Sequence, residues 1–146
     1  MKSILFVCLG NICRSPLAEG VARNIIYKKN LDITVDSAGT GDWHIGDAPC
    51  ENSIKVASLN GLDISLQKAR QVKPADFEDF DMIVALDDSN IENLKKLGAT
   101  EIHKLGQFGH QGEDVPDPYF FDGFEGFDKV FEMIETCVQK LIDEHA

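Results

Sequence analysis

The sequence predicts an α/β fold: a single doubly wound domain with a four-stranded parallel sheet and helices on both faces. Short apolar runs alternate along the chain with longer segments of helical character, which is the pattern of parallel strands joined by helices. The first apolar run has almost no polar interruption, as expected for a strand buried on both faces. The length of 146 residues, of which 43% are hydrophobic, fits one domain over residues 1–146.

The predicted elements follow one another in a regular order. We expect strands at Ser3–Val7, Ile33–Ser37, Asp81–Leu86 and, more weakly, Glu101–Leu105. We expect helices at 16–29, Cys50–Asn60 and Asp88–Leu97, and a last helix with Phe127, Phe131, Ile134, Val138 and Leu141 on one face. Pro16 suits a first helical turn, and Gly61 and Gly98 suit helix ends. A loop rich in Gly, Asp and Pro covers 106–123.

Charge is unevenly distributed along the chain, whose net charge is −11. Residues 1–73 carry nine Lys/Arg and seven Asp/Glu, whereas residues 74–146 carry five and eighteen. No nucleic-acid partner is expected, because proteins bind nucleic acids mainly by neutralising phosphates. The first apolar run, about five residues long, is too short for a signal peptide or a membrane span. We therefore expect a cytoplasmic protein without a membrane partner, and we predict no particular oligomeric state.

The segment that follows the first strand predicts a phosphate-binding loop. In parallel sheets the active crevice lies beyond the carboxyl ends of the strands. The chain there reads Cys-Leu-Gly-Asn-Ile-Cys-Arg-Ser from Cys8 to Ser15, and a helix begins at once. Such a loop can point backbone N–H groups at an anion, and Gly10 and Asn11 tolerate the positive φ that this often requires. The helix N-terminus favours a thiolate on Cys8, and Arg14 offers a planar fork for two phosphate oxygens.

This segment resembles the loop of the low-molecular-weight protein tyrosine phosphatases, which reads Cys-x-Gly-Asn-x-Cys-Arg-Ser-Pro near the N-terminus. The resemblance implies hydrolysis of phosphotyrosine in a protein or peptide, and of small aryl phosphates, through a phosphocysteine intermediate and without a cofactor. It implies that Cys8 is the nucleophile and that Arg14 holds the phosphate. Asn11 would fix the shape of the loop, and Ser15 would donate a hydrogen bond to the Cys8 sulfur. The other phosphate-binding positions would be Leu9, Gly10, Ile12 and Cys13.

The long loop contains Asp117-Pro118-Tyr119, which resembles the acid loop of the same family. Asp117 would protonate the leaving oxygen and then help water attack the phosphocysteine, a role typically worth about 10²–10⁴-fold. Asp114 is its nearest rival. Tyr119 would flank the substrate ring. The region carries six carboxylates, at Glu113, Asp114, Asp117, Asp122, Glu125 and Asp128. We expect this rim to favour phosphotyrosine in basic or neutral surroundings.

The segment that begins at Ser37 also resembles the family, because it contains the motifs Ser-Ala-Gly-Thr and, three residues further on, Trp-His. By that resemblance Ser37 would support the phosphate loop and Trp43 would line the mouth of the pocket, whereas His44 is read as structural or exposed. The chain departs from the family at two positions. Gln67 stands where many members carry His, and we expect it still to support the loop. Phe120 replaces a second tyrosine, which removes a phosphorylation site.

Three other functions compete with this interpretation. An arsenate reductase shares the fold and the loop, but its thioredoxin-coupled members need two further cysteines near the third strand, where residues 82–89 have none. A protein arginine phosphatase would carry Thr where this chain has Ile12, and an apolar side chain suits an aryl ester better. A non-catalytic phosphate-binding or thiol redox module is the third alternative.

The four cysteines, Cys8, Cys13, Cys50 and Cys137, are expected to be reduced thiols. No metal site is predicted, because Cys8 and Cys13 lack the usual ligand spacing. A disulfide from Cys13 to an oxidised Cys8 would protect the nucleophile from further oxidation. The sequence is equally consistent with Cys13 as a small side chain that faces the core. Cys137 lies beside the apolar face of the last helix and is expected in the core.

Overall fold

The strands form one parallel sheet at the centre of the fold. The computed structural model describes residues 1–118 and 123–146. Within them, β1 (Ser3–Cys8), β2 (Thr34–Gly39), β3 (Met82–Ala85) and β4 (His103–Lys104) lie in the order β2-β1-β3-β4. All neighbouring strands are parallel, and Ile4 of β1 lies opposite both Val35 and Met82. The predicted four-stranded parallel sheet is confirmed.

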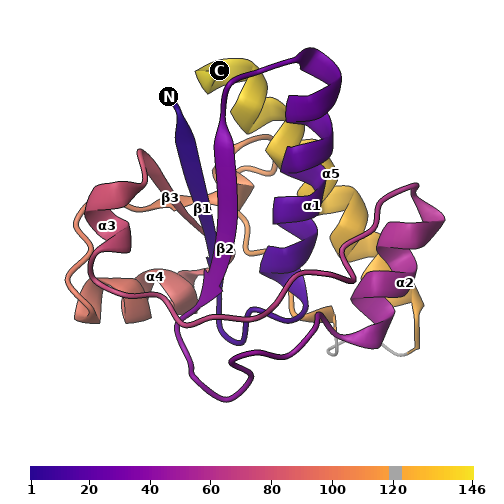
Figure 1. Ribbon diagram of the computed structural model, residues 1–146, viewed down its shortest axis with the longest axis horizontal. Helices are drawn as coiled ribbons and strands as arrows, with labels where there is room; N and C mark the ends of the chain where they lie inside the picture. The colour runs from indigo at the N-terminus through magenta and orange to yellow at the C-terminus, as the bar shows by residue number, and fades with distance from the viewer. Residues whose placement is uncertain (119–122) are drawn as a thin grey trace.

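Helices cover both faces of this sheet (Figure 1). On one face lie α1 (Arg14–Lys29), α2 (Glu51–Leu59) and α5 (Glu125–His145), and on the other α3 (Asp76–Asp79) and α4 (Asp88–Lys96). The alternation of β1 side chains separates two cores, as the pleat of a strand requires. Ile4, Phe6 and Cys8 pack with α1 and α5, whereas Leu5 and Val7 pack with α4. The prediction of helices on both faces is confirmed.

Most predicted elements differ from the observed ones by a residue or two at their ends. The helix α3 was not predicted, since a single turn is too short to show a helical period. The fourth strand is only two residues long, and a 3₁₀ helix, η1 (Leu105–Gln107), follows it where a loop was expected. The apolar face of α5 is confirmed, because all five of its predicted residues are buried.

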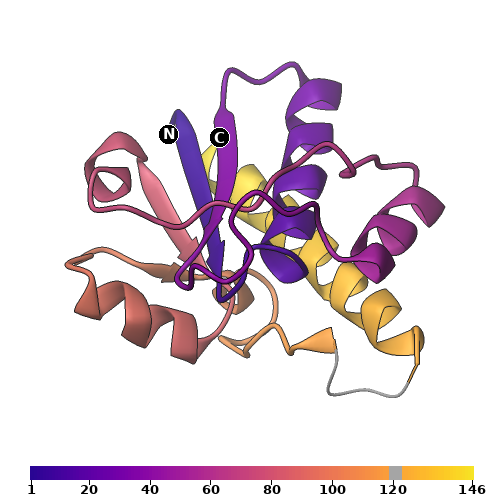
Figure 2. The ribbon, with the colours of Figure 1, turned by 60° about the horizontal axis from the view of Figure 1, so that its bottom comes forward.

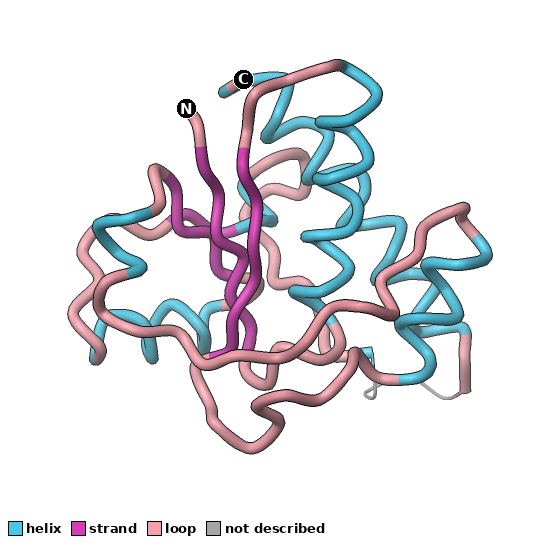
Figure 3. Tube along the Cα trace, in the orientation of Figure 1, coloured by secondary structure: helices cyan, strands magenta, loops and turns pink. Residues whose placement is uncertain are grey.

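The carboxyl ends of the strands and the loops that follow them gather at one edge of the sheet (Figures 2 and 3). The chain leaves β1 for α1 on one face and β3 for α4 on the other. The end of β1 is therefore the point where the winding direction changes, which is the usual ligand site of such sheets. No helix within the described residues is long and apolar enough to cross a membrane.

Candidate active site

The segment between β1 and α1 is a tight loop whose carbonyl groups are held from outside. Four of them accept hydrogen bonds: Cys8 from Thr40 N (3.0 Å), Leu9 from Gly41 N (2.9 Å), Ile12 from Cys50 N (2.7 Å) and Cys13 from Ser53 Oγ (3.1 Å). In a trans peptide the C=O and the following N–H point in opposite directions. The N–H that follows each of these carbonyls therefore faces the inside of the loop, which makes a nest for an anion.

Two residue types allow this tight curvature. Asn11 has φ 56°, so the expected positive φ occurs at this residue. Gly10 does not adopt a positive φ, and its use is different: a Cβ there would lie 3.1 Å from Cδ2 of His44. At the end of β2, a Cβ on Gly39 would lie only 2.7 Å from the carbonyl oxygen of Leu9. Glycine at that position lets β2 approach the loop.

The buried side chain of Asn11 connects the loop to its surroundings. Its Oδ1 accepts the backbone N–H of Arg70 at 3.0 Å, and this donor identifies the oxygen end of the amide. Nδ2 then donates to Ser15 Oγ at 2.8 Å and to Ser37 Oγ at 2.9 Å. Ser37 Oγ donates in turn to Oε1 of buried Glu19 at 2.7 Å. A chain of hydrogen-bonded, buried side chains thus holds the loop in place.

The sulfur of Cys8 is an acceptor at the centre of this arrangement. Because Ser15 Oγ already accepts a hydrogen bond from Asn11 Nδ2, its own hydroxyl hydrogen is available to donate to Cys8 Sγ, 2.9 Å away. The backbone N–H of Asn11 also donates to the sulfur, at 3.3 Å. The N-terminus of α1 follows directly. Hydrogen-bond donors and the positive end of a helix together stabilise a thiolate.

Arg14 is buried beside the loop and is held by two acceptors. Its Nη1 donates to Asp87 Oδ2 at 2.6 Å and to the carbonyl of Val115 at 2.9 Å. Burial disfavours the charge of the guanidinium, but the negative charges of Cys8, Asp87 and Asp117 outweigh it, so the pKa of Arg14 is raised above its ordinary value. Arg14 is therefore a permanent positive charge in a fixed orientation beside the sulfur.

A hollow of about 190 Å³ opens at this loop. Its walls are Cys8, Leu9, Gly10, Ile12, Cys13, Arg14, Trp43, His44 and Asp117. Trp43 is 68% exposed and stands at the rim, whereas Asp117 is half-buried. The structure thus brings the predicted nucleophile, phosphate ligand and acid together around one space. Tyr119, predicted to flank the substrate ring, lies outside the described residues.

Two other candidate residues do not line this hollow. Asp114 Oδ1 accepts the N–H of Asp88 at 3.0 Å and lies 2.7 Å from Lys104 Nζ. Burial raises the pKa of Asp114, but its hydrogen bonds and the charge of Lys104 outweigh burial and lower it. Gln67 Nε2 donates to the carbonyl of Pro16 at 3.1 Å, in the first turns of α1. Gln67 thus reaches the helix that follows the loop.

Sequence reasoning missed the position of Asp87. One of its oxygens holds Arg14, and the other accepts the N–H of Asn90 at 2.7 Å and so caps α4. A signal existed, because Asp87 follows the third strand at the same sheet edge as the phosphate loop. His44, expected to be structural or exposed, is partly exposed and also lines the hollow, with Nδ1 3.2 Å from Asp47 Oδ2.

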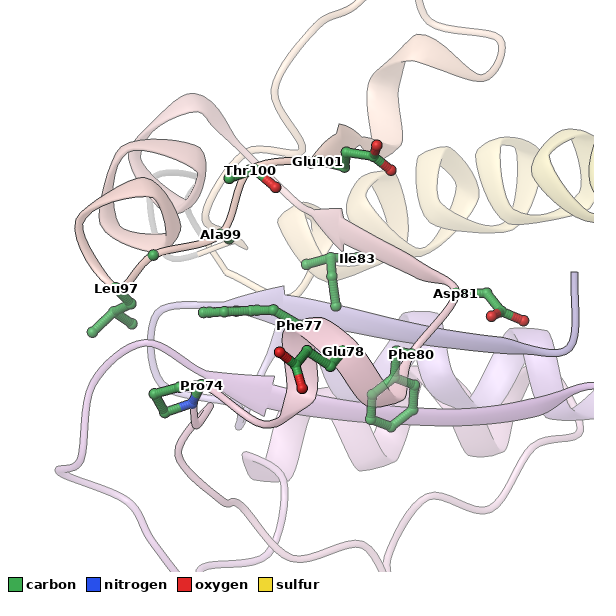
Figure 4. A pocket seen from close by; sticks show the side chains of 11 residues that line it. Pro74, Phe77, Glu78, Phe80, Asp81, Ile83, Leu97, Ala99, Thr100 and Glu101 are labelled. Carbon is green, nitrogen blue, oxygen red and sulfur yellow. The ribbon is translucent and has the colours of Figure 1, made fainter.

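A larger hollow, of about 500 Å³, lies on the sheet face that α3 and α4 cover, between α3 and the end of α4 (Figure 4). Phe77, Phe80 and Ile83 provide apolar walls there, and Glu78 and Glu101 provide carboxylates. The described residues that line it include no cysteine, histidine or arginine. No group of three or more metal-ligating side chains occurs within 1–118 and 123–146. Reactive groups therefore converge on the smaller hollow.

Comparison with known proteins agrees with this geometry. The family model for low molecular weight phosphotyrosine protein phosphatase matches residues 3–146. The low molecular weight protein-tyrosine-phosphatase YfkJ of Bacillus subtilis is 41% identical, over 97% of this chain and 94% of YfkJ. A crystal structure of YfkJ matches 99% of this chain and 94% of its own, with a TM-score of 0.89.

Two further proteins show how wide the likeness is. PtpA of Staphylococcus aureus, also a low molecular weight protein-tyrosine-phosphatase, is 39% identical over 98% of this chain and 93% of PtpA. The crystal structure of a Drosophila arginine phosphatase is 32% identical, with a TM-score of 0.89 over 99% of this chain and 98% of that one. With the family model spanning almost its whole length, the chain belongs to the low molecular weight phosphotyrosine protein phosphatase family.

Proposed function

We propose that this protein hydrolyses phosphotyrosine in proteins and peptides through a phosphocysteine intermediate on Cys8. The observation that carries the proposal is the hollow of about 190 Å³, around which Cys8, Arg14 and Asp117 converge. A sulfur that accepts two hydrogen bonds lies beside a buried guanidinium and a half-buried carboxyl group. These are a nucleophile, an anion ligand and a proton donor, the three groups that the reaction requires.

In the first step the Cys8 thiolate attacks phosphorus, and the bond from phosphorus to the tyrosine oxygen breaks. Asp117 gives its proton to that oxygen, so that tyrosine leaves as a neutral phenol. The inward N–H groups of the loop and the fork of Arg14 hold the phosphoryl oxygens. Leu9, Gly10, Ile12 and Cys13 contribute the walls of the loop, and Trp43 contributes the rim.

In the second step water attacks the phosphocysteine. The carboxylate of Asp117 takes a proton from this water, the S–P bond breaks, and phosphate and the Cys8 thiolate are released. The hydroxyl of Ser15, 2.9 Å from the sulfur, stabilises the thiolate as it leaves. Asn11 and Ser37 hold Ser15 and the loop in place. No cofactor or metal enters either step.

A second candidate is the hydrolysis of phosphoarginine, because a Drosophila arginine phosphatase has a closely similar structure. Ile12 stands in the wall of the hollow. Its side chain is apolar and branched, and it offers no hydroxyl to the polar guanidinium of phosphoarginine. A tyrosine ring instead gains from apolar contact. The wall at Ile12 therefore favours the aryl ester.

We also propose a cytoplasmic location for a single domain over residues 1–146, with phosphotyrosine proteins as partners. The four cysteines support this location, since a reducing compartment keeps a nucleophilic thiol active. No role in nucleic-acid binding is proposed, since the chain carries a net charge of −11.

The decisive experiment is an assay of the purified, reduced protein on phosphotyrosine, phosphoserine and phosphoarginine peptides, with Cys8→Ser as control. We expect turnover of phosphotyrosine that disappears in the variant. Faster turnover of phosphoarginine would keep the mechanism and reverse our reading of Ile12. No turnover of any peptide by folded, reduced protein would instead indicate a phosphate-binding or redox module.

A further inference from the structure

A second thiol pair lies next to the phosphate loop. The sulfur atoms of Cys13 and Cys50 are 2.7 Å apart. Cys13 precedes the first residue of α1, and Cys50 precedes the first residue of α2. Two elements distant in sequence thus bring their N-terminal cysteines into contact. A disulfide, with sulfur atoms about 2.05 Å apart, needs only a small further approach.

The backbone on both sides holds this pair together. The N–H of Cys50 donates to the carbonyl of Ile12 at 2.7 Å. Ser53, which is fully buried, donates from Oγ to the carbonyl of Cys13 at 3.1 Å and lies 3.1 Å from Cys50 Sγ. The packing of α2 against the loop therefore holds the backbones of the two cysteines close together.

The positions of the four cysteines determine which of them can take part in disulfide exchange. Cys13 lines the same hollow as Cys8 and also contacts Cys50, so it can exchange with either of them. Cys13 and Cys50 are both partly exposed, which allows small oxidants and thiols to reach them. Cys137 is fully buried in the core and takes no part.

We propose that Cys13 and Cys50 form a disulfide that carries the oxidising equivalent of a peroxide away from Cys8. The proposal rests on the proposed function in one respect, since it requires Cys8 to be a reactive thiolate. Cys50 is then the resolving thiol of the site, and the nucleophile recovers without an external reductant.

The transfer from Cys8 to Cys50 takes three steps. The Cys8 thiolate takes an oxygen atom from hydrogen peroxide, which gives a sulfenic acid and hydroxide. The thiol of Cys13 condenses with this sulfenic acid to give a Cys8–Cys13 disulfide and water. The thiolate of Cys50, its proton lost to solvent, attacks the Cys13 sulfur, and Cys8 leaves with the electron pair of the broken bond. The products are a Cys13–Cys50 disulfide and a restored Cys8 thiolate.

The hydrogen bonds around the sulfurs give this exchange its direction. The departing Cys8 thiolate is received by Ser15 Oγ at 2.9 Å and by the N–H of Asn11 at 3.3 Å. A well-stabilised thiolate is the better leaving group in thiol–disulfide exchange. The new disulfide joins two sulfurs that are already in contact. We therefore expect the oxidised protein to rest with the disulfide between Cys13 and Cys50.

Peptide mapping distinguishes the two possible disulfides. Trypsin leaves Cys8 and Cys13 together on the peptide 3–14, whereas Cys50 lies on the peptide 30–55. The reduced protein, freed of small thiols, is treated with one equivalent of hydrogen peroxide, alkylated and digested. We expect a cross-link between the two peptides, with Cys8 alkylated and phosphotyrosine turnover regained. A disulfide confined to peptide 3–14, or a sulfinic acid on Cys8, would overturn the proposal.

Variants test the transfer itself. After peroxide treatment, Cys50→Ser should retain the Cys8–Cys13 disulfide within peptide 3–14. Until a reductant is added, its activity should be roughly tenfold or more below that of wild type treated in the same way. Recovery as fast as in wild type would contradict the role of Cys50. In Cys8→Ser, peroxide should form the Cys13–Cys50 disulfide at least about tenfold more slowly, since the reactive thiolate is missing. An equal rate would show direct oxidation of the pair and exclude transfer from Cys8.

The controls separate this proposal from the proposed function. Reduced wild type and reduced Cys50→Ser are first assayed on the phosphotyrosine peptide, and equal turnover shows that the variant is folded. Cys50→Ala replaces it if that turnover is low. Absence of turnover in reduced wild type would refute the proposed function, and the peptide map would still report where a disulfide forms. Cys137→Ala should regain activity like wild type.

Discussion

Asp114 and Asp117 lie in the same loop, but their different contacts give them different roles. Asp117 lines the hollow with Cys8 and shares its electrostatic field with Arg14. Asp114 is engaged by Lys104 and by the N–H of Asp88. A carboxylate held by a cation is a poor proton donor, because its neutral form is disfavoured. Of these two carboxyl groups, Asp117 is therefore the better placed to act as the acid.

The first prediction concerns this pair. Asp117→Asn should lower turnover of a phosphotyrosine peptide by about 10²–10⁴-fold, because the amide gives no proton to the leaving oxygen. The loss should be smaller for an aryl phosphate with a more acidic phenol, which leaves without help. Asp114→Asn is the matched control and should keep near wild-type kcat. Similar losses in the two variants would refute the assignment.

A second residue-scale prediction concerns Asp87, a positioning residue that orients Arg14 and caps α4. Asp87→Ala should lower the free energy of unfolding by about 0.5–2 kcal/mol, because the cap is lost. Asp87→Asn keeps a capping oxygen and should lose less.

Both Asp87 variants should weaken inhibition by inorganic phosphate roughly tenfold, because Arg14 loses the carboxylate oxygen that orients its guanidinium. Urea unfolding and phosphate inhibition constants, measured on the same preparations, separate the two effects. A loss of stability in Asp87→Ala with unchanged phosphate inhibition would leave Asp87 as a cap alone.

At the scale of elements, α5 supplies much of the core on the face that it shares with α1. Its buried residues include Phe127, Phe131, Ile134, Cys137 and Val138. Cys137 is fully buried, as expected from its place beside the apolar face. Burial raises the pKa of the Cys137 thiol from 9.0 to about 11. The cause is desolvation, which disfavours the thiolate.

This shift predicts a pH dependence of stability. Between pH 9.0 and about 11 the unfolded chain releases the Cys137 proton while the folded chain keeps it. Because the unfolded state then binds fewer protons, the free energy of unfolding falls as pH rises through this window. Below pH 9.0 the contribution of the Cys137 thiol to stability is present in full. Across the window wild type should lose up to about 2 kcal/mol more than Cys137→Ala.

Urea unfolding at pH 8 and in the alkaline window measures this difference. All other ionisable groups are common to the two proteins, so the comparison isolates Cys137. Cys137→Ala should be less stable at pH 8, because it leaves a small cavity, but its decline with pH should be shallower. Parallel declines in the two proteins would refute the buried thiol as the cause.

At the scale of the whole molecule, the acidic half of the chain reaches the active site. Asp117 of this half lines the hollow, whereas Glu113, Glu125 and Asp128, the other described acidic residues expected at the rim, do not line it. Asp114, counted with them from sequence, is largely neutralised by Lys104 at 2.7 Å. The field of the rim is therefore weaker than the sequence suggests.

A peptide with basic residues around phosphotyrosine should have a higher kcat/KM than one with acidic residues. The difference should shrink as salt is raised, because the screening length falls from about 30 Å at 0.01 M to about 10 Å at 0.1 M. Matched peptides at both ionic strengths measure it. Equal efficiency at the lower ionic strength would show that the rim does not act on the substrate.

Local pattern determined a large part of this protein. The buried strand before Cys8, the helix after it and the residue types between them predicted both the sheet and the place of the phosphate loop. Such features depend on neighbours in sequence, since periodicity, turn residues and helix ends are local. The four-residue α3 was beyond this reasoning, because so few residues show no period. The fourth strand was expected over five residues, and only two of them, His103 and Lys104, are in β4.

Contacts between distant elements became visible only in the fold. It placed Asp87 against Arg14, separated Asp114 from Asp117, and brought Cys50 to within 2.7 Å of Cys13. The place of Asp87 after the third strand was one indication, but no local pattern gives the partners themselves. Each contact depends on how elements from different parts of the chain pack around the end of β1. The chemical groups of the site and the strand that presents them can be read from the residues alone, whereas the packing of the helices sets which partner each group contacts.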